Sequence, residues 1–504
     1  MHPRRDFLLF AKVIFIAGLT LFLFSKTSNA ATHYVSPAGS ATWANSTNIS
    51  TPCAITTAFA NAIAGDLVYF RGGNYYFPQS TNYETPPSGY SIANSGTSGN
   101  PITFKAYTGE IPNFVGYRGW SGNEQVLMLS NNSRTNLTFD GFSFEAFSGA
   151  NGTGTRFTPE IVLFSASDVA LNIIIQNCTF TGTTISLQDN HHMIWIGGPA
   201  GYYSSYVTIR NCLFKDMIAA SSNSDFHGVA AIMPYGYPPI SHHVTIQNNE
   251  FRNCSVGIYF KGSSNPPATY FNISNNFFNR VEAAVAFNPN GGDYHSIYNN
   301  IIVLSRVSGS SSRILAGVDF DGYQGTPSTG NQFYNNTIYS TDNVSNGSGG
   351  LVGHAATTQI YNNIIKLGNL GGIEKTGVAY FYSNSSLTYL NNNNFGNSPF
   401  SFHVISTDYS TISTLQAANI LVNTSNPCFS RQPCNNIAAS PVFTNGSGLL
   451  NTPLDFLLTV ASPGYRAGSD GKDMGANVTL VGPTPGAIGD PPPSSPKNFL
   501  IMGN

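Results

Sequence analysis

The sequence predicts an all-β fold: a single-stranded right-handed parallel β-helix, a solenoid of stacked coils with a short N-terminal capping helix. Two observations carry this prediction, a strand-like phrase that recurs along the chain and asparagines at a fixed place after it. The composition agrees. Charged residues make up 9% of the 504 residues, against about 25% in an ordinary globular protein. Hydrophobic residues reach 41%, enough to build a core, so the low charge does not indicate disorder.

The recurring phrase reads apolar-x-apolar-x-Asn-(Asn/Cys)-x-Phe. Clear copies occupy 173–180, 207–214, 244–251 and 271–278, and weaker ones 297–300, 333–336, 360–363 and 390–392. From the first asparagine of each copy to the next, the steps are 34, 37, 27, 24, 36, 27 and 29 residues. Such steps suit stacked coils that share one core and differ in loop length. A propeller would need steadier spacing, and a leucine-rich repeat a Leu-x-x-Leu-x-Leu frame.

The repeated asparagine is expected to form a turn. Asparagine tolerates left-handed backbone angles, and its side chain can bond the asparagine of the next coil to make a ladder. Cys178 and Cys212 occupy equivalent positions in two copies, where we expect them to stack as small buried residues.

The amino end predicts export. Residues 1–30 read as a signal peptide: Arg4 and Arg5 precede an apolar run, and Ser28-Asn29-Ala30 resembles a cleavage site. An uncleaved anchor is the alternative, but the run from Phe7 to Phe24 is short for a bilayer span of about 20 residues. No later segment is apolar enough to cross a bilayer, so we expect a secreted protein with no membrane contact after cleavage.

The rest of the chain divides by composition and repeats. We expect 31–117 to form the cap and first coils, with a helix over Ile55 to Ala64 covering the open end of the core. Residues 118–404 should form the β-helix coils, 405–482 the C-terminal coils and a loop-rich closing region, and 483–504 a Pro-rich linker or tail. Cys428 and Cys434 lie close together, and in an exported protein we expect a local disulfide between them.

The charge narrows the partners. A net charge of −2 gives no basic field for nucleic acid and no polybasic membrane patch. An uncharged surface rich in asparagine and aromatic rings suits sugars, although tight turns alone explain most of the asparagines. We expect a monomer whose partner is a polysaccharide.

A second strand of each coil carries the candidate site. It begins with a small residue followed by an apolar one, at 257–261, 284–288, 317–321 and 350–354. Side chains alternate across a strand, and adjacent rungs lie about 4.8 Å apart. The side chains that point away from the core are therefore expected to form a column along the coils. This outward column consists of Lys261, Asn288, Asp321 and His354, with Tyr259 and Asp319 beside it.

Other stretches carry a resemblance to a family. The opening Tyr34-Val35-Ser36-Pro37, the stretch Gly65 to Tyr75, and the closing Asp455-Phe456-Leu457-Leu458 and Asp473-Met474-Gly475-Ala476, together with the repeats, resemble the pectate-lyase-like superfamily of secreted right-handed β-helix proteins. The resemblance covers nearly the whole mature chain. It implies the fold and a glycan partner, but this scaffold also carries hydrolases, epimerases and adhesins.

Within this superfamily, Gly257 to Ser263 resembles the rung that bears the lysine base of alginate- and chondroitin-type lyases. Lys261 would then remove the C5 proton of a uronate while the sugar at C4 is expelled. The base must be neutral when it acts, through desolvation or a nearby positive charge. The arginine that some of these families place one rung later is absent here, since the matching position is Phe287 or Asn288.

The acidic pair leaves alternatives open. The Asp-Asp-Gly-x-Asp calcium cluster of one pectate lyase family is absent, and Asp319-Phe320-Asp321-Gly322 is the nearest counterpart. Asp319 and Asp321 are therefore candidate calcium ligands, a paired-carboxylate hydrolase site, or a turn cap.

Further candidates lie on earlier rungs. His227 is a candidate proton donor, with Asp225 beside it, and Trp195 could stack on a sugar ring; each also has an ordinary packing explanation. With Tyr259, Asn288 and His354, Asp225 and Trp195 complete the candidate substrate-binding set. Three functions remain: a uronate polysaccharide lyase, a glycoside hydrolase on the same scaffold, and a non-catalytic glycan-binding or adhesive protein.

Overall fold

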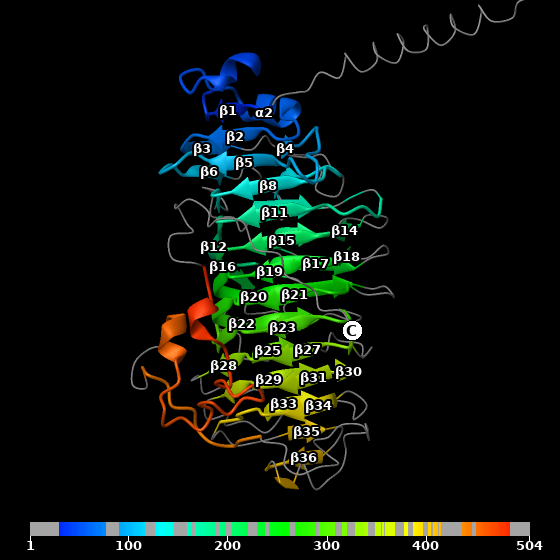
Figure 1. Ribbon diagram of the computed structural model, residues 1–504, viewed down its shortest axis with the longest axis vertical. Helices are drawn as coiled ribbons and strands as arrows, with labels where there is room; N and C mark the ends of the chain where they lie inside the picture. Colours follow the sequence, from blue (N-terminus) through cyan, green and yellow to red (C-terminus); the bar gives the residue numbers. More distant parts are fainter. Residues whose placement is uncertain are drawn as a thin grey trace, which may run out of the picture.

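The computed structural model is a right-handed parallel β-helix, elongated along one axis (Figure 1). It describes residues 30–76, 90–115, 126–145, 159–163, 165, 167–187, 191–197, 203–219, 229–236, 241–262, 268–287, 292–307, 315–319, 328–340, 348–353, 355–356, 358–367, 377–381, 387–396, 402–404, 407–411, 413–414, 436–445 and 450–483. The predicted signal peptide, the Pro-rich tail and the Cys428–Cys434 pair lie outside these residues. No helix among them is long and apolar enough to cross a membrane.

One strand of each coil joins a 12-stranded parallel sheet, here called sheet A. Its strands, in spatial and chain order, are β1 (Thr32–Val35), β2 (Leu67–Phe70), β5 (Ile102–Ala106), β8 (Leu137–Asp140), β11 (Ile173–Gln176), β15 (Val207–Arg210), β19 (Thr245–Gln247), β21 (Asn272–Ser274), β23 (Ser296–Tyr298), β27 (Gln332–Tyr334), β31 (Thr358–Tyr361) and β34 (Leu387–Asn391). The strand halves of the repeated phrases are the strands from β11 onward, which confirms the repeat as a coil.

The other long strands form a 20-stranded sheet that contains two rows. The second row, directly after sheet A in each coil, holds β3 (Gly73–Tyr76), β6 (Pro112–Val115), β9 (Ser143–Glu145), β12 (Thr179–Leu187), β16 (Leu213–Ala219), the first parts of β20 (Glu250–Gly262) and β22 (Phe277–Phe287), β24 (Ile301–Leu304), β28 (Thr337–Tyr339) and β32 (Ile364–Lys366). Asn253 and Arg280 adopt positive φ of 53° and 62° inside β20 and β22, and there these two strands turn into the third row.

The third row holds β4 (Tyr90–Ser91), β7 (Val126–Ser130), β10 (Pro159–Leu163), β13 (His192–Ile196), β17 (Ala230–Gly236), the later parts of β20 and β22, β25 (Leu315–Asp319), β29 (Ser348–Gly353), β33 (Gly377–Phe381) and β35 (Phe402–Val404), with β36 (Thr407–Tyr409) antiparallel to β35. Two short pairs, β14 (Ser204–Ser205) with β18 (Ser241–His242) and β26 (Ser328–Thr329) with β30 (Ala355–Ala356), complete the described strands.

The core is a continuous column of apolar side chains inside the coils. The phenylalanine that ends each clear repeat lies on this column: Phe180, Phe214, Phe251 and Phe278 stack with ring centroids 4.6 to 5.0 Å apart. This spacing equals the separation of adjacent strands, about 4.8 Å, so each coil places its ring on that of the coil before.

Two consecutive residues form the turn after sheet A. The first is an asparagine with left-handed backbone, as at Asn211 and Asn275, with φ of 54° and 58°. The second forms the ladder: the amide of Asn276 donates to Asn300 Oδ1 at 3.0 Å and accepts from Asn249 at 3.0 Å. The predicted turn and ladder are confirmed. The second residue forms the continuous ladder, and the predicted bond between left-handed asparagines is also present where Asn299 Nδ2 donates to Asn275 Oδ1 at 2.7 Å. In the last copy the left-handed residue is Asn392 (φ 51°), one position after our alignment.

The ladder position also explains the cysteines. In two coils before that of Asn249, the ladder position is occupied by Cys178 and Cys212. Both cysteines are fully buried, as predicted. Cys53, Cys178, Cys212 and Cys254 are free thiols.

The predicted capping helix is confirmed as α2 (Ile55–Asn61). It lies at the end of the molecule that begins with β1 (Figure 1). The buried ring of Phe59 lies 5.0 Å from that of Phe104 and 6.0 Å from that of Phe70, so the helix closes the open end of the core.

Residues 450–483, called the C-terminal segment below, return along the side of the coils instead of extending the stack (Figure 1). They contain two 3₁₀ turns, Pro453–Phe456 and Val478–Leu480. Four first asparagines of these turns hold the segment by side-chain bonds, made by Asn392 to Ala467, Asn362 to Ser469, Asn299 to Asn477 and Asn248 to Leu480. The segment thus runs opposite to the order of the coils.

Candidate functional site

The third row aligns the residues beside the outward column, Tyr259 and Asp319, as the sequence predicted. Tyr259 pairs in register with Ala286, Ala286 with Asp319, and Asp319 with Val352. Between them, Ile258 and Phe260 point into the core. The alternation therefore places Tyr259, Lys261 and Asp319 on the outer face of the coils.

Lys261 lies at the end of β20, opposite Tyr235 of β17. The lysine is half-buried, and so is Tyr235. The sequence analysis did not single out Tyr235, because it followed the outward pattern only from the rung of Tyr259 onward. Two further residues along a strand return to the same face, so the alternation from Met233 predicts Tyr235.

An aromatic group lies beside the lysine. Trp195 of β13 pairs in register with Met233, and its ring meets that of Tyr235 edge to face, with centroids 5.8 Å apart and planes at 89°. Both rings pack against a small apolar cluster that includes Met233 and Tyr259. Tyr259 is only 9% exposed, so its ring serves more as packing for this face than as an open platform.

The indole of Trp195 has a polar property of its own. Its Nε1–H is buried and has no hydrogen-bond partner among the described residues. A buried donor left unsatisfied costs about 1–3 kcal/mol. Trp195 is half-buried as a residue, so part of the ring stays accessible.

Small residues separate the two ends of the site. Ala283, Ala286 and Ala316 are buried in the same apolar cluster, and Ala286 stands between Tyr259 and Asp319. Two rung steps of about 4.8 Å thus separate the backbones of Tyr259 and Asp319. Asp319 is half-buried and is the last residue of β25.

Five predicted site residues lie outside the described part of the chain: Asp225, His227, Asn288, Asp321 and His354. Among the described residues, no group of three or more His, Cys, Asp and Glu side chains could hold a metal ion. Asp319 is the one described member of the candidate calcium pair, so the calcium site stays a prediction.

Comparison with known proteins gives similarity in fold. No family model matches the chain, and no curated protein matches it. Among solved structures, pectate lyase Pel9A is 14% identical, with 89% of this chain and 96% of that chain covered and a TM-score of 0.35. The Streptococcus pneumoniae surface protein and adhesin PfbA is 13% identical, with 70% and 90% covered and a TM-score of 0.47.

A glycoside hydrolase is 9% identical, with 76% of this chain and 98% of that chain covered and a TM-score of 0.44. At such identities and TM-scores these similarities carry no argument about activity. The fold of this chain rests on its own strand order and register.

Proposed function

We propose that the protein is a secreted polysaccharide lyase that cleaves a uronic-acid-containing chain by β-elimination on the outer face of the third row, acting as a monomer. One observation carries the proposal. The strand register brings the amine of Lys261, the phenol of Tyr235, the indole of Trp195 and the carboxylate of Asp319 to one face of neighbouring coils.

In this proposal Lys261 acts as the base. Its neutral amine takes the proton from C5 of the uronate, the electron pair forms the C4=C5 double bond, and the bond from C4 to the glycosidic oxygen breaks. The leaving oxygen must gain a proton, and the phenol of Tyr235, opposite Lys261, is the candidate donor. Desolvation favours the neutral form of an amine, which fits the half-buried position of Lys261.

The other side chains would bind the substrate. Trp195 offers a partly exposed apolar ring, which suits the apolar face of a sugar. Asp319, with Asp321, would bind a sugar hydroxyl directly or hold a calcium ion that binds the uronate carboxylate.

The test begins with a screen of pectate, alginate and glycosaminoglycans for the ultraviolet absorbance of an unsaturated uronate. On the polymer that is cleaved, Lys261→Ala should lower turnover by about 10²-fold or more, as for the loss of a general base, with an unchanged melting temperature. Lys261→Arg is the matched control, since it keeps the positive charge but cannot act as a base. It should be equally inactive. Asp319→Asn should have a smaller effect.

Three results would contradict the proposal. Full activity of Lys261→Arg would mean that the lysine only binds the substrate through its positive charge and does not act as a base. New reducing ends without absorbance, abolished by Asp319→Asn, would indicate a hydrolase. Retention on a polymer affinity gel without cleavage would indicate a glycan-binding or adhesive protein. Treatment with a chelator separately tests calcium: activity that is lost and then restored by added calcium supports the metal site.

A further inference from the structure

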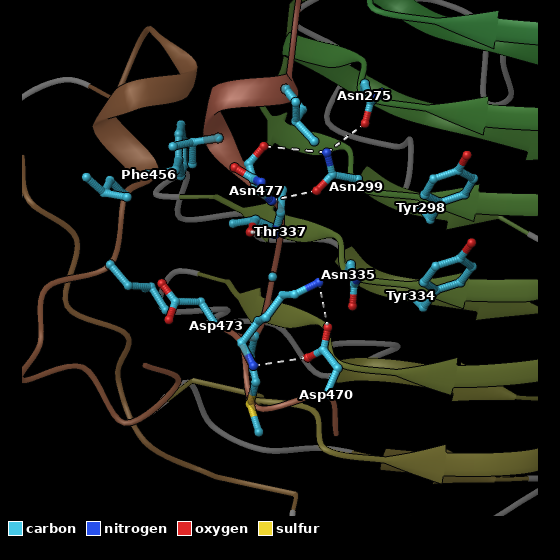
Figure 2. A pocket seen from close by; sticks show the side chains of 18 of the residues that line it. Asn275, Tyr298, Asn299, Tyr334, Asn335, Thr337, Phe456, Asp470, Asp473 and Asn477 are labelled. Atoms are coloured by element: carbon cyan, nitrogen blue, oxygen red, sulfur yellow. Dashed lines mark hydrogen bonds and ion pairs between the residues drawn. The ribbon is translucent and has the colours of Figure 1, made fainter. Parts of the chain in front are cut away.

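A pocket lies between sheet A and the C-terminal segment (Figure 2). Its volume is about 950 Å³, at the upper end of the range of about 300–1,000 Å³ that ligand pockets cover. Tyr298, Tyr334 and Asn335 come from the coils, while Phe456, Arg466 and Asn477 come from the C-terminal segment. The pocket shares no residue with the face that carries Lys261.

The wall formed by the C-terminal segment is fixed in place. The backbone N–H of Asn477 donates to Asn299 Oδ1 at 2.5 Å, and that of Gly475 donates to the carbonyl of Asn362 at 2.7 Å. The N–H of Gly482 donates to the carbonyl of Asn275 at 2.8 Å. These bonds anchor the wall on both sides of the pocket. Ligand binding would therefore lose little conformational entropy in ordering the wall.

A column of tyrosines lies along the coil side. Tyr298, Tyr334 and Tyr361 follow each other in register on three strands, and their rings stack at 4.9 Å with planes 5° and 2° apart. Stacked rings cover each other's faces, so they present edges and hydroxyls. Burial raises the pKa of the Tyr334 phenol above its usual value, so this hydroxyl keeps its proton and can donate at any physiological pH.

The charges of the lining cancel. Arg466 and Lys472 are matched by Asp470 and Asp473. Lys472 Nζ lies 3.5 Å from Asp470 Oδ2, and Asp473 Oδ1 accepts from the backbone N–H of Arg466 at 3.0 Å. A pocket with phenols, amides and some apolar surface but no net charge suits a ligand with many neutral hydroxyls.

We propose that this pocket binds an uncharged oligosaccharide or an uncharged stretch of a polysaccharide. The phenol of Tyr334 and the amide of Asn335 would bond the hydroxyls, and the exposed side chains of Leu457 and Leu480 would contact an apolar sugar face. The proposal does not depend on the lyase activity, because the site lies on a different sheet and its ligand carries no carboxylate.

The experiment measures binding to the full-length protein by calorimetry. The probes are short oligosaccharides prepared from xylan, mannan and galactan, with oligogalacturonate as the charged comparison. At least one uncharged probe should bind, with little change between low and high salt. Tyr334→Phe and Asn335→Gly should each weaken it by about tenfold, as for a lost hydrogen bond. Glycine is used at position 335 because it accepts the positive φ of 53° there.

Matched controls locate the binding. Tyr361→Phe removes a hydroxyl from the same column outside the pocket lining, and Lys261→Ala alters the proposed catalytic face; both should bind as the wild type does. Hydrogen exchange of residues 464–477 should slow when the probe is added. Three results would overturn the proposal: no uncharged probe binds, Tyr334→Phe and Asn335→Gly leave binding unaffected, or only the charged probe binds. None of these results bears on cleavage by Lys261.

Discussion

The two consecutive asparagines in the turns after sheet A have three structural roles: forming the turn, binding the C-terminal segment and forming the ladder. The first adopts a left-handed backbone, as at Asn299 (φ 54°), and its side chain is free to bond the C-terminal segment. The second is fully buried and bonds its equivalents in both neighbouring coils, as Asn300 does. Asparagine suits all three tasks because it tolerates positive φ and carries both a donor and an acceptor.

Loss of a ladder asparagine should be costly. In Asn276→Ala, the buried amide of Asn249 and its backbone N–H lose their acceptor, and a buried donor left unsatisfied costs about 1–3 kcal/mol. We expect the free energy of unfolding to fall by about 2 kcal/mol or more, measured by denaturant titration. Asn211→Gly is the control, since glycine accepts the positive φ of 54° at that position, and its stability should stay near that of the wild type. Equal stability of the two variants would contradict a structural role for the ladder.

The ion pair between Arg71 and Glu110 predicts a pH dependence. The guanidinium of Arg71, which donates to both carboxylate oxygens at 2.7 to 3.0 Å, together with the backbone N–H of Gly72, holds the pKa of Glu110 below its usual value. A lowered pKa stabilises the fold above the unfolded pKa of about 4.3, and this stabilisation is lost as the pH falls through the folded value. The stability difference between wild type and Glu110→Gln should therefore be constant near neutral pH and shrink below about pH 4. A difference that persists in strong acid would show that the variant acts through packing instead.

At the scale of the elements, the sequence predicted the features that recur in every coil. Sheet A, the left-handed turns and the register of Tyr259 with Ala286 and Asp319 all follow from a pattern that returns once per coil. The pairing of Lys261 with Tyr235 was missed, although the alternation of side chains along the strand predicts that Tyr235 lies on the outer face. The path of the C-terminal segment has no such pattern. Its partners lie far back in the chain, as Asn299 does for Asn477, 178 residues apart, and they are polar groups that any asparagine-rich loop could supply.

The C-terminal segment should unfold separately from the coils. Phe456 anchors it, with its buried ring 5.4 Å from that of Phe443 and 5.6 Å from that of Tyr339. Truncating a buried phenylalanine costs about 3–5 kcal/mol, so Phe456→Ala should speed hydrogen exchange across 450–483 and leave the strands of sheet A protected. Leu454→Ala is the control, because that side chain is 62% exposed. Uniform deprotection of the coils by Phe456→Ala would mean that the segment and the coils unfold as one unit.

At the scale of the whole molecule, the fold is close to one-dimensional. Each described strand of sheet A between the end strands β1 and β34 pairs with the strands of the coils directly before and after it, and the core runs from α2 to Phe395. In such a solenoid, stability is a sum of coil terms and nearest-neighbour terms, so damage at one end should weaken with distance along the axis. The two candidate sites lie on different sheets of this scaffold, and each can change without the other.

The capping helix gives the test of this independence. In Phe59→Ala the first coils lose the ring that covers Phe70 and Phe104, at a local cost of about 3–5 kcal/mol. Hydrogen exchange should rise in β1, β2 and β5 and stay unchanged from β21 to β31. Phe251→Ala, in the middle of the aromatic stack between Phe214 and Phe278, should instead raise exchange in the coils on both sides of it. An equal rise of hydrogen exchange from β1 to β34 in Phe59→Ala would contradict this prediction. It would mean that damage at the cap destabilises every coil, so that the coils unfold as a single cooperative unit.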